Sequence, residues 1–190
     1  MTDGSEDEFE SRIIGDSIVR EMLSEFCARS PGKRKRFCIP GARLNDITAA
    51  RDDVTQDGDS NTLYIIHAGT NDIQYSNPDE LLAKYKLMIQ RFKMKTDRLV
   101  ISGILPRIHA NRAFYGKAYS INNQLKSLCS RENVGFVNMW DNFYNESSLF
   151  QDDGLHLNSV GSARLGRLFS DQVALYKSKN GGRLGASPTT

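Results

Sequence analysis

Short apolar runs alternate along the chain with longer segments in which apolar positions recur every three or four residues. The runs predict buried strands, and the spaced positions predict amphipathic helices. We expect strands at residues 12–14, 37–39, 63–68, 99–104 and 136–139. We expect helices at residues 18–26, 44–54, 78–92, 115–131 and 160–176. Strands that are apolar throughout and that alternate with helices predict a parallel sheet covered on both faces.

The pattern therefore predicts an α/β fold, a three-layer α/β/α sandwich around a five-stranded parallel sheet. Right-handed crossover connections favour a flavodoxin-like strand order. A length of 190 residues suits one domain with a substantial core. We expect a flexible acidic lead over residues 1–10, the single domain over residues 11–177 and a disordered tail over residues 178–190.

Composition says more about the cellular compartment of the protein than about its chemistry. The net charge of +2 is too small to indicate nucleic-acid binding by itself. The three cysteines, Cys27, Cys38 and Cys129, are odd in number and lack paired spacing, which predicts neither a disulfide framework nor a zinc site. The acidic start differs from a signal peptide, and no apolar run has the length of a membrane span. We therefore expect an intracellular, cytoplasmic protein.

Three short polar segments carry the candidate chemistry, and each follows an apolar run. They are Gly-Asp-Ser at 15–17, Gly-Thr-Asn-Asp at 69–72 and Asp-Gly-Leu-His at 153–156. The carboxyl ends of parallel strands share one edge of the sheet, so we expect these segments to meet there. A serine, an amide and an Asp/His pair supply the nucleophile, oxyanion donor, base and base-orienting group of an acyl-transfer site.

Three of the candidate residues, Ser17, Gly41 and Asn71, each allow a structural interpretation as well as a catalytic one. Ser17 begins a helix whose dipole favours nearby negative charge, but serine also simply caps helices. Gly41 lets a backbone N–H approach a ligand, although Pro-Gly is also an ordinary turn. The Asn71 amide suits an oxyanion, although asparagine also shapes turns. We expect Asp16 and Asp72 to be cap or turn residues.

The candidate base is one of three histidines. His156 is favoured because Asp153, three residues earlier, can bond its second ring nitrogen, with Asp152 as the alternative partner. The other interpretation is a solvated histidine in a surface loop. His67 ends a strand and is expected in packing or behind the site, and a substrate contact by His109 stays open.

These segments resemble the conserved blocks of the SGNH hydrolases, also called the GDSL esterase/lipase superfamily. The matching residues are Gly15, Asp16 and Ser17, with Ile18 in place of leucine, then Gly41, then Gly69 to Asp72, and finally Asp153 to His156. The resemblance implies Ser17 as nucleophile, His156 as base and Asp153 as orienter. It implies an oxyanion hole made by the Ser17 and Gly41 N–H groups and the Asn71 amide. It also implies hydrolysis of small acyl or acetyl esters without a metal or cofactor.

Residues 40–47, 104–107 and 136–141 are similar, more narrowly, to the esterase domain in the first open-reading-frame protein of some LINE-type retrotransposons. This narrower resemblance implies a small or lipid ester as substrate. It also implies a larger host protein that associates with RNA and with a membrane surface. It leaves the oligomeric state of this domain open.

Two basic segments keep a second function open. The run Lys33 to Arg36 is expected in a loop before the second strand, either solvated or in contact with RNA or anionic lipid. The segment after the fourth strand is a candidate substrate-facing lid, unless its aromatic residues pack in the core; it carries Arg107, Arg112, Phe114, Tyr115, Lys117 and Tyr119. The alternative to a serine esterase is thus an SGNH-fold binding module for RNA or anionic membrane.

Overall fold

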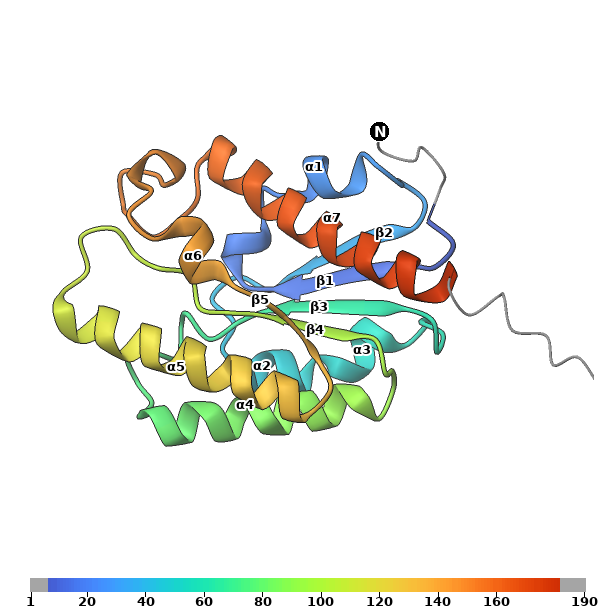
Figure 1. The fold of residues 1–190 in the computed structure, drawn as a ribbon, viewed down its shortest axis with the longest axis horizontal. Helices are drawn as coiled ribbons and strands as arrows, with labels where there is room; N and C mark the ends of the chain where they lie inside the picture. Colours follow the sequence, from blue (N-terminus) through green and yellow to red (C-terminus); the bar gives the residue numbers. More distant parts are fainter. Residues whose placement is uncertain (1–6, 182–190) are drawn as a thin grey trace, which may run out of the picture.

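Parallel strands in the order β2-β1-β3-β4-β5 form one sheet at the centre of the protein. In the computed structural model, which describes residues 7–181, this sheet has five strands (Figure 1). They are β1 (Ser11–Gly15), β2 (Arg34–Cys38), β3 (Leu63–His67), β4 (Leu99–Ser102) and β5 (Gly135–Val137). The predicted fold class and flavodoxin-like strand order are confirmed.

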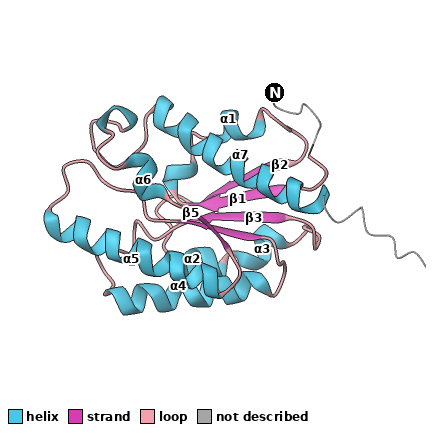
Figure 2. Cartoon of the chain, viewed as in Figure 1, coloured by secondary structure: helices cyan, strands magenta, loops and turns pink. Residues whose placement is uncertain are grey.

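Helices cover both faces of the sheet and make the outer two layers (Figures 1 and 2). One face carries α1 (Leu23–Cys27) and α7 (Ser159–Gly181). The other face carries α2 (Leu44–Ala49), α3 (Arg51–Thr55), α4 (Pro78–Lys93) and α5 (Arg112–Arg131). A short α6 (Met139–Phe143) follows β5, and 3₁₀ turns lie at Ser17–Val19 and Ser147–Leu149.

The sheet separates two apolar cores, which explains the uninterrupted apolar strands. Ile14, Ile66 and Ile101 pack on the side of α4 and α5, whereas Ile13 and Ile65 pack on the side of α1 and α7. All five side chains are fully buried. Successive strand residues point to opposite faces, so burial of both faces requires an apolar residue at every position.

Two predicted helices are broken in the structure, and one helix was not predicted. Residues 18–26 form a 3₁₀ turn and α1, and residues 44–54 form α2 and α3. Met22 and Phe26 are nonetheless fully buried, because periodicity fixes which positions face the core without requiring a continuous helix. The unpredicted α6 is capped by Asn138, whose side chain accepts a hydrogen bond from the Asp141 N–H at 3.2 Å.

The prediction that the basic run lies in a loop is wrong, because three of its residues belong to β2. Strand pairing begins at Ser11 and Arg34, and this pairing overrides the weak strand preference of charged residues. Arg34 is buried, and its Nε lies 2.6 Å from Asp7 Oδ2. Its charge is therefore neutralised inside the protein, which weakens the case for RNA or lipid binding by this run.

The ends of the described chain pack against the domain. Asp7 and Phe9, expected in a flexible lead, are buried, and Lys177 Nζ lies 2.6 Å from Asp7 Oδ1. Helix α7 continues to Gly181, so residues 178–181 are helical and not a disordered tail as expected. The remaining parts of the expected lead and tail, residues 1–6 and 182–190, lie outside the described residues. None of the helices within residues 7–181 is long and apolar enough to cross a membrane.

Candidate active site

Ser17 lies at the carboxyl edge of the sheet, immediately beyond β1. Its neighbour Asp16 caps the following turn, since Asp16 Oδ1 accepts a hydrogen bond from the Ile18 N–H at 3.0 Å. The capping interpretation of Ser17 is therefore not needed, and its hydroxyl is left for another partner. That partner is His156, whose Nε2 lies 3.1 Å from Ser17 Oγ across 139 positions of sequence.

The second ring nitrogen of His156 is held by Asp153. Asp153 Oδ2 lies 2.6 Å from His156 Nδ1, while Oδ1 accepts hydrogen bonds from the Leu155 and His156 N–H groups at 2.9 Å each. The hydrogen bond from His156 and those backbone bonds lower the pKa of Asp153 to about 2. Asp152, the alternative partner, forms no hydrogen bond or ion pair with His156 within the described residues. Ser17, His156 and Asp153 thus form a continuous hydrogen-bonded relay.

Gly154 fixes the conformation of the loop that carries Asp153 and His156. Gly154 has a φ of +65°, and a Cβ built there would lie 2.7 Å from the Ile108 carbonyl oxygen. The Gly154 carbonyl accepts a hydrogen bond from the Ile108 N–H at 2.7 Å. The Asp-Gly step at 153–154 is the turn signal in the sequence that points to this constraint.

Asn71 joins the other two segments of the predicted site. Its Nδ2 donates to the Ala42 carbonyl at 3.0 Å and lies 3.4 Å from Asp16 Oδ2. The amide therefore lies beside both the residue that follows Gly41 and the residue that precedes Ser17. Gly41 itself has a φ of +73°. The structure therefore places the Asn71 amide next to the two loops that carry the other predicted oxyanion donors, the N–H groups of Ser17 and Gly41.

Asp72 has a wider role than the turn predicted for it. Its Oδ2 accepts a hydrogen bond from the Leu44 N–H at 2.9 Å, and it is buried. This bond ties the Asn71 loop to the start of α2, just after Gly41. The sequence carries no signal for this tie, because Leu44 and Asp72 become neighbours only in the folded chain.

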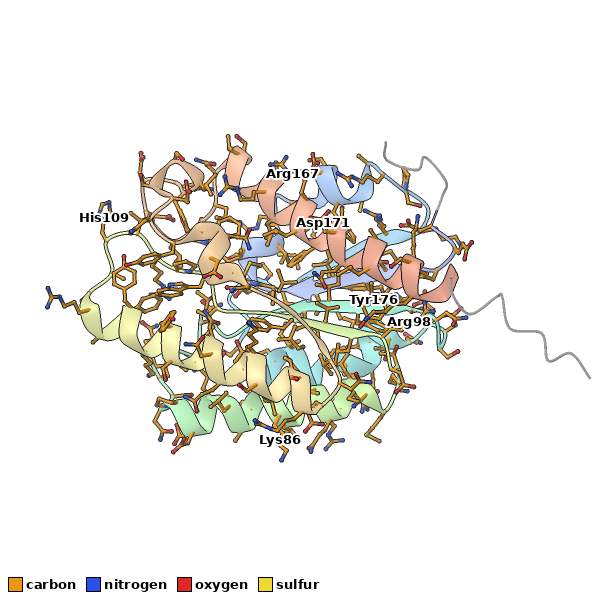
Figure 3. The ribbon with its side chains drawn as sticks, viewed as in Figure 1. Lys86, Arg98, His109, Arg167, Asp171 and Tyr176 are labelled. Carbon is orange, nitrogen blue, oxygen red and sulfur yellow. The ribbon has the colours of Figure 1, made fainter. Side chains whose placement is uncertain are left out.

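The other two histidines are not part of the relay. His67 is fully buried in β3, its Nδ1 lies 2.6 Å from Ser102 Oγ, and burial lowers its pKa. It packs behind the site, in line with the prediction. His109 is exposed on the loop between β4 and α5, at the end of the molecule where the strands terminate (Figure 3).

A hollow of about 560 Å³ lies beside Asp153, against the predicted basic and aromatic segment. Arg107, Phe114 and Lys117 line it, whereas Arg112 does not. Of the other two aromatic residues of that segment, Tyr115 packs against the core, as the alternative interpretation held, whereas Tyr119 is 53% exposed and does not. Tyr115 and Tyr119 make edge contacts with the Trp140 ring, with centroid separations of 6.1 and 5.7 Å.

Sequence comparison identifies the family. Residues 13–164 match the model of the GDSL-like lipase/acylhydrolase family, and the chain belongs to this family. The resemblance to SGNH hydrolases noted above is thereby confirmed. No curated protein sequence matches the chain.

Solved structures share the fold at low sequence identity. A member of the lipolytic G-D-S-L family from Veillonella parvula has a TM-score of 0.75 at 15% identity, covering 86% of this chain and 97% of its own. A GDSL-like lipase from Bacteroides thetaiotaomicron has a TM-score of 0.71 at 17% identity, covering 87% of each chain. A catalytic mutant of an acetylxylan esterase from Geobacillus stearothermophilus has a TM-score of 0.70 at 16% identity, covering 90% and 96%.

Family membership, together with these shared folds, supports a hydrolase that acts on esters. The fold and family carry no information on RNA, membranes or a larger host protein. The narrower resemblance to a retrotransposon-encoded esterase therefore stays a prediction.

Proposed function

We propose that this protein is a serine ester hydrolase that removes small, acetyl-like acyl groups through an acyl-enzyme intermediate. The observation that carries the proposal is the relay from Ser17 Oγ through His156 to Asp153, with separations of 3.1 and 2.6 Å. The acetylxylan esterase of similar fold supports the same residue types, since its catalytic mutants replace a serine and a histidine by alanine.

The relay assigns the proton transfers. With Nδ1–H donated to Asp153, His156 Nε2 is free to accept the Ser17 hydroxyl proton as Oγ attacks the ester carbonyl carbon. The Asp153 carboxylate stabilises the imidazolium that results. His156 then returns the proton to the leaving alcohol as the carbon–oxygen bond breaks. Water attacks the acyl-enzyme by the same proton path, which releases the acid and restores Ser17.

The negative charge that develops on the carbonyl oxygen needs hydrogen-bond donors. In the proposal these are the Ser17 and Gly41 N–H groups and the second Nδ2 hydrogen of Asn71. One Nδ2 hydrogen bonds to the Ala42 carbonyl at 3.0 Å, which orients the amide nitrogen before substrate binds. The other makes a longer contact of 3.4 Å with Asp16 Oδ2, which the oxyanion would replace. Such preorganised donors typically lower the barrier by about 2.7–4 kcal/mol each.

The exposure of the site favours a short acyl group. The side chains of His156 and Asp153 are 38% and 46% exposed, and Ser17 is half-buried. A site this open offers little apolar surface to a long acyl chain, whose binding would depend on burying its methylene groups. The acetyl ester processed by the structural neighbour from Geobacillus stearothermophilus is consistent with this choice.

Hydrolysis of p-nitrophenyl acetate, butyrate and octanoate tests the proposal. Wild type should hydrolyse the acetate with the highest kcat/KM, and Ser17→Ala should lose about three orders of magnitude or more. Ser120→Ala, a change at an exposed serine on α5, serves as the matched control and should keep the wild-type rates. Equal rates for wild type and Ser17→Ala would sink the mechanism, and a preference for octanoate would sink the assignment of a small acyl group.

A further inference from the structure

The hollow beside Asp153 contains two cationic side chains that have no carboxylate partner. Its volume of about 560 Å³ lies within the usual range for small-molecule sites. Arg107 and Lys117 line one part of it, and the loop at 153–155 lines another. No ion pair joins either cation to a described acidic residue.

Arg107 is held between two segments of the catalytic relay and oxyanion site. Its Nη2 donates to the Thr70 carbonyl at 3.1 Å, directly before Asn71. The N–H of the next residue, Ile108, donates to the Gly154 carbonyl at 2.7 Å, directly after Asp153. The guanidinium also lies 4.8 Å from the centroid of the Phe114 ring. These contacts fix the guanidinium next to the loops that carry Asn71 and Asp153.

The hydrogen-bonding capacity of Arg107 is largely unused. The side chain is half-buried, its Nε is buried without an acceptor, and its Nη1 has no acceptor among the described residues. Burial without a counter-ion lowers its pKa. Lys117 Nζ donates only to the main-chain carbonyls of Ile73 and Ser76, which leaves its charge unneutralised. Charged groups are rarely withdrawn from water without an opposite charge, unless a ligand supplies it.

The Asp153 carboxylate, which also borders the hollow, does not supply that charge. Both of its oxygens are occupied, one by the His156 ring and one by two backbone N–H groups. His109 borders the hollow from the same loop as Arg107 and adds no negative charge. The surroundings therefore favour an anion.

We propose that this hollow binds an anionic group of the ester substrate, a carboxylate or a phosphate, with Arg107 as its main donor. The inference rests on the proposed ester hydrolysis and narrows its substrates to esters that carry a negative charge near the scissile bond. A guanidinium matches the geometry of both anions with paired donors, and Lys117 adds a second positive charge.

Matched pairs of esters test this inference. The probes are 4-acetoxybenzoate and 4-acetoxyphenyl phosphate, each compared with the neutral methyl 4-acetoxybenzoate. Wild type should prefer at least one charged ester by about tenfold or more in kcat/KM, and Arg107→Gln should lower that preference about tenfold. Arg107→Lys should retain part of it, because the charge stays while the paired donors are lost. The ester with the larger preference identifies the anion.

Lys86→Gln is the matched control for charge removal. Lys86 is exposed on α4, on a different side of the molecule from His109, which lines the hollow (Figure 3). This variant should keep the wild-type preference. If wild type prefers neither charged ester, or Arg107→Gln slows charged and neutral esters equally, the inference is overturned. Hydrolysis of the neutral ester that depends on Ser17 would then leave the proposed function standing.

Binding without turnover separates the two claims. Ser17→Ala leaves the hollow intact, so NMR titration of this variant with 4-acetoxybenzoate and with its methyl ester measures the anion preference directly. Tighter binding of the charged ester by about tenfold supports the inference even if wild type hydrolyses neither probe, in which case the proposed function fails alone. Equal affinities for the two esters overturn the inference.

Discussion

The side-chain amide of Asn71 lies 3.4 Å from the Asp16 carboxylate, beside the residue that precedes Ser17. The same nitrogen donates to the Ala42 carbonyl at 3.0 Å. Two acceptors on separate loops thus restrain the amide so that its nitrogen, and not its oxygen, faces them. An oxyanion donor requires this orientation before substrate binds, because reorientation during the reaction would cost free energy.

Replacing Asn71 by alanine should therefore lower kcat/KM for p-nitrophenyl acetate by about 10²- to 10³-fold. The fold should persist, since the change removes only the hydrogen bond of about 1 kcal/mol to the Ala42 carbonyl and the longer one to Asp16. Steady-state kinetics and thermal melting measure the two effects. Asn123→Ala, at an exposed position on α5, is the matched control. A loss of only a few-fold would remove Asn71 from the oxyanion hole.

Asp153→Asn should lower kcat by about three to four orders of magnitude, because an amide no longer enforces the His156 tautomer or stabilises the imidazolium. The neighbouring Asp152→Asn is the control, and it should change kcat less than threefold or so, since within residues 7–181 Asp152 forms no hydrogen bond or ion pair with His156. Kinetics with p-nitrophenyl acetate distinguish the two. A larger effect at Asp152 than at Asp153 would reverse the assignment.

The acid side of the pH–rate profile should report a single proton. The pKa of Asp153 is lowered to about 2, first by the hydrogen bond from His156 and then by two backbone N–H groups. Asp153 therefore stays ionised well into the acid range, so its own protonation should not contribute to any loss of activity above about pH 4. Log kcat/KM for p-nitrophenyl acetate should fall there with a slope no steeper than about one. A slope of two there would contradict the assignment.

Asp7→Asn tests the buried ion pair that neutralises Arg34. Burial raises the pKa of Asp7, but hydrogen bonds from Arg34 and Lys177 outweigh it, so the pKa lies below 3.8. The stabilisation is therefore present at neutral pH and is lost as the pH falls through the folded-state pKa. At pH 7 the variant should lose about 3–5 kcal/mol of unfolding free energy, measured by urea denaturation.

This cost should shrink as the pH falls below about 4, because Asp7 of the unfolded wild-type chain then becomes protonated before the folded carboxylate does. Asp171→Asn, at an exposed position on α7 (Figure 3), is the control and should cost less than about 0.5 kcal/mol at either pH. A cost for Asp7→Asn that is the same in acid as at pH 7 would show that it does not arise from the carboxylate charge.

The sheet could be predicted from the sequence because local pattern and tertiary burial agree there. Ile13, Ile14, Ile65 and Ile66 are apolar at consecutive positions, and both faces of the sheet are in fact buried. The extent of β2 could not be predicted, since the charged Arg34 belongs to a strand only through pairing with β1 and contact with Asp7. Such contacts leave no periodic signal.

The segments that form the site could be predicted from the sequence, but the hydrogen bonds between their residues could not. The segments of Ser17 and Asn71 directly follow β1 and β3, and parallel topology brings those strand ends together. The segment at 153–156, expected directly after a strand, lies instead in a loop beyond α6 and the second 3₁₀ turn, so the meeting of Ser17 with His156 depends on that loop. Local preference could not decide which residue caps the turn, because aspartate and serine are equally good caps. The structure assigns the cap to Asp16, and this assignment frees the Ser17 hydroxyl.

Labelling with a fluorophosphonate, which forms a covalent adduct only with an activated serine, tests the relay most directly. Intact-mass and peptide mass spectrometry should find a single adduct per chain, located on Ser17. His156→Ala should slow its formation by about three orders of magnitude or more, because no base then removes the hydroxyl proton. Folded wild type that stays unlabelled, or an adduct on a different serine, would contradict the account.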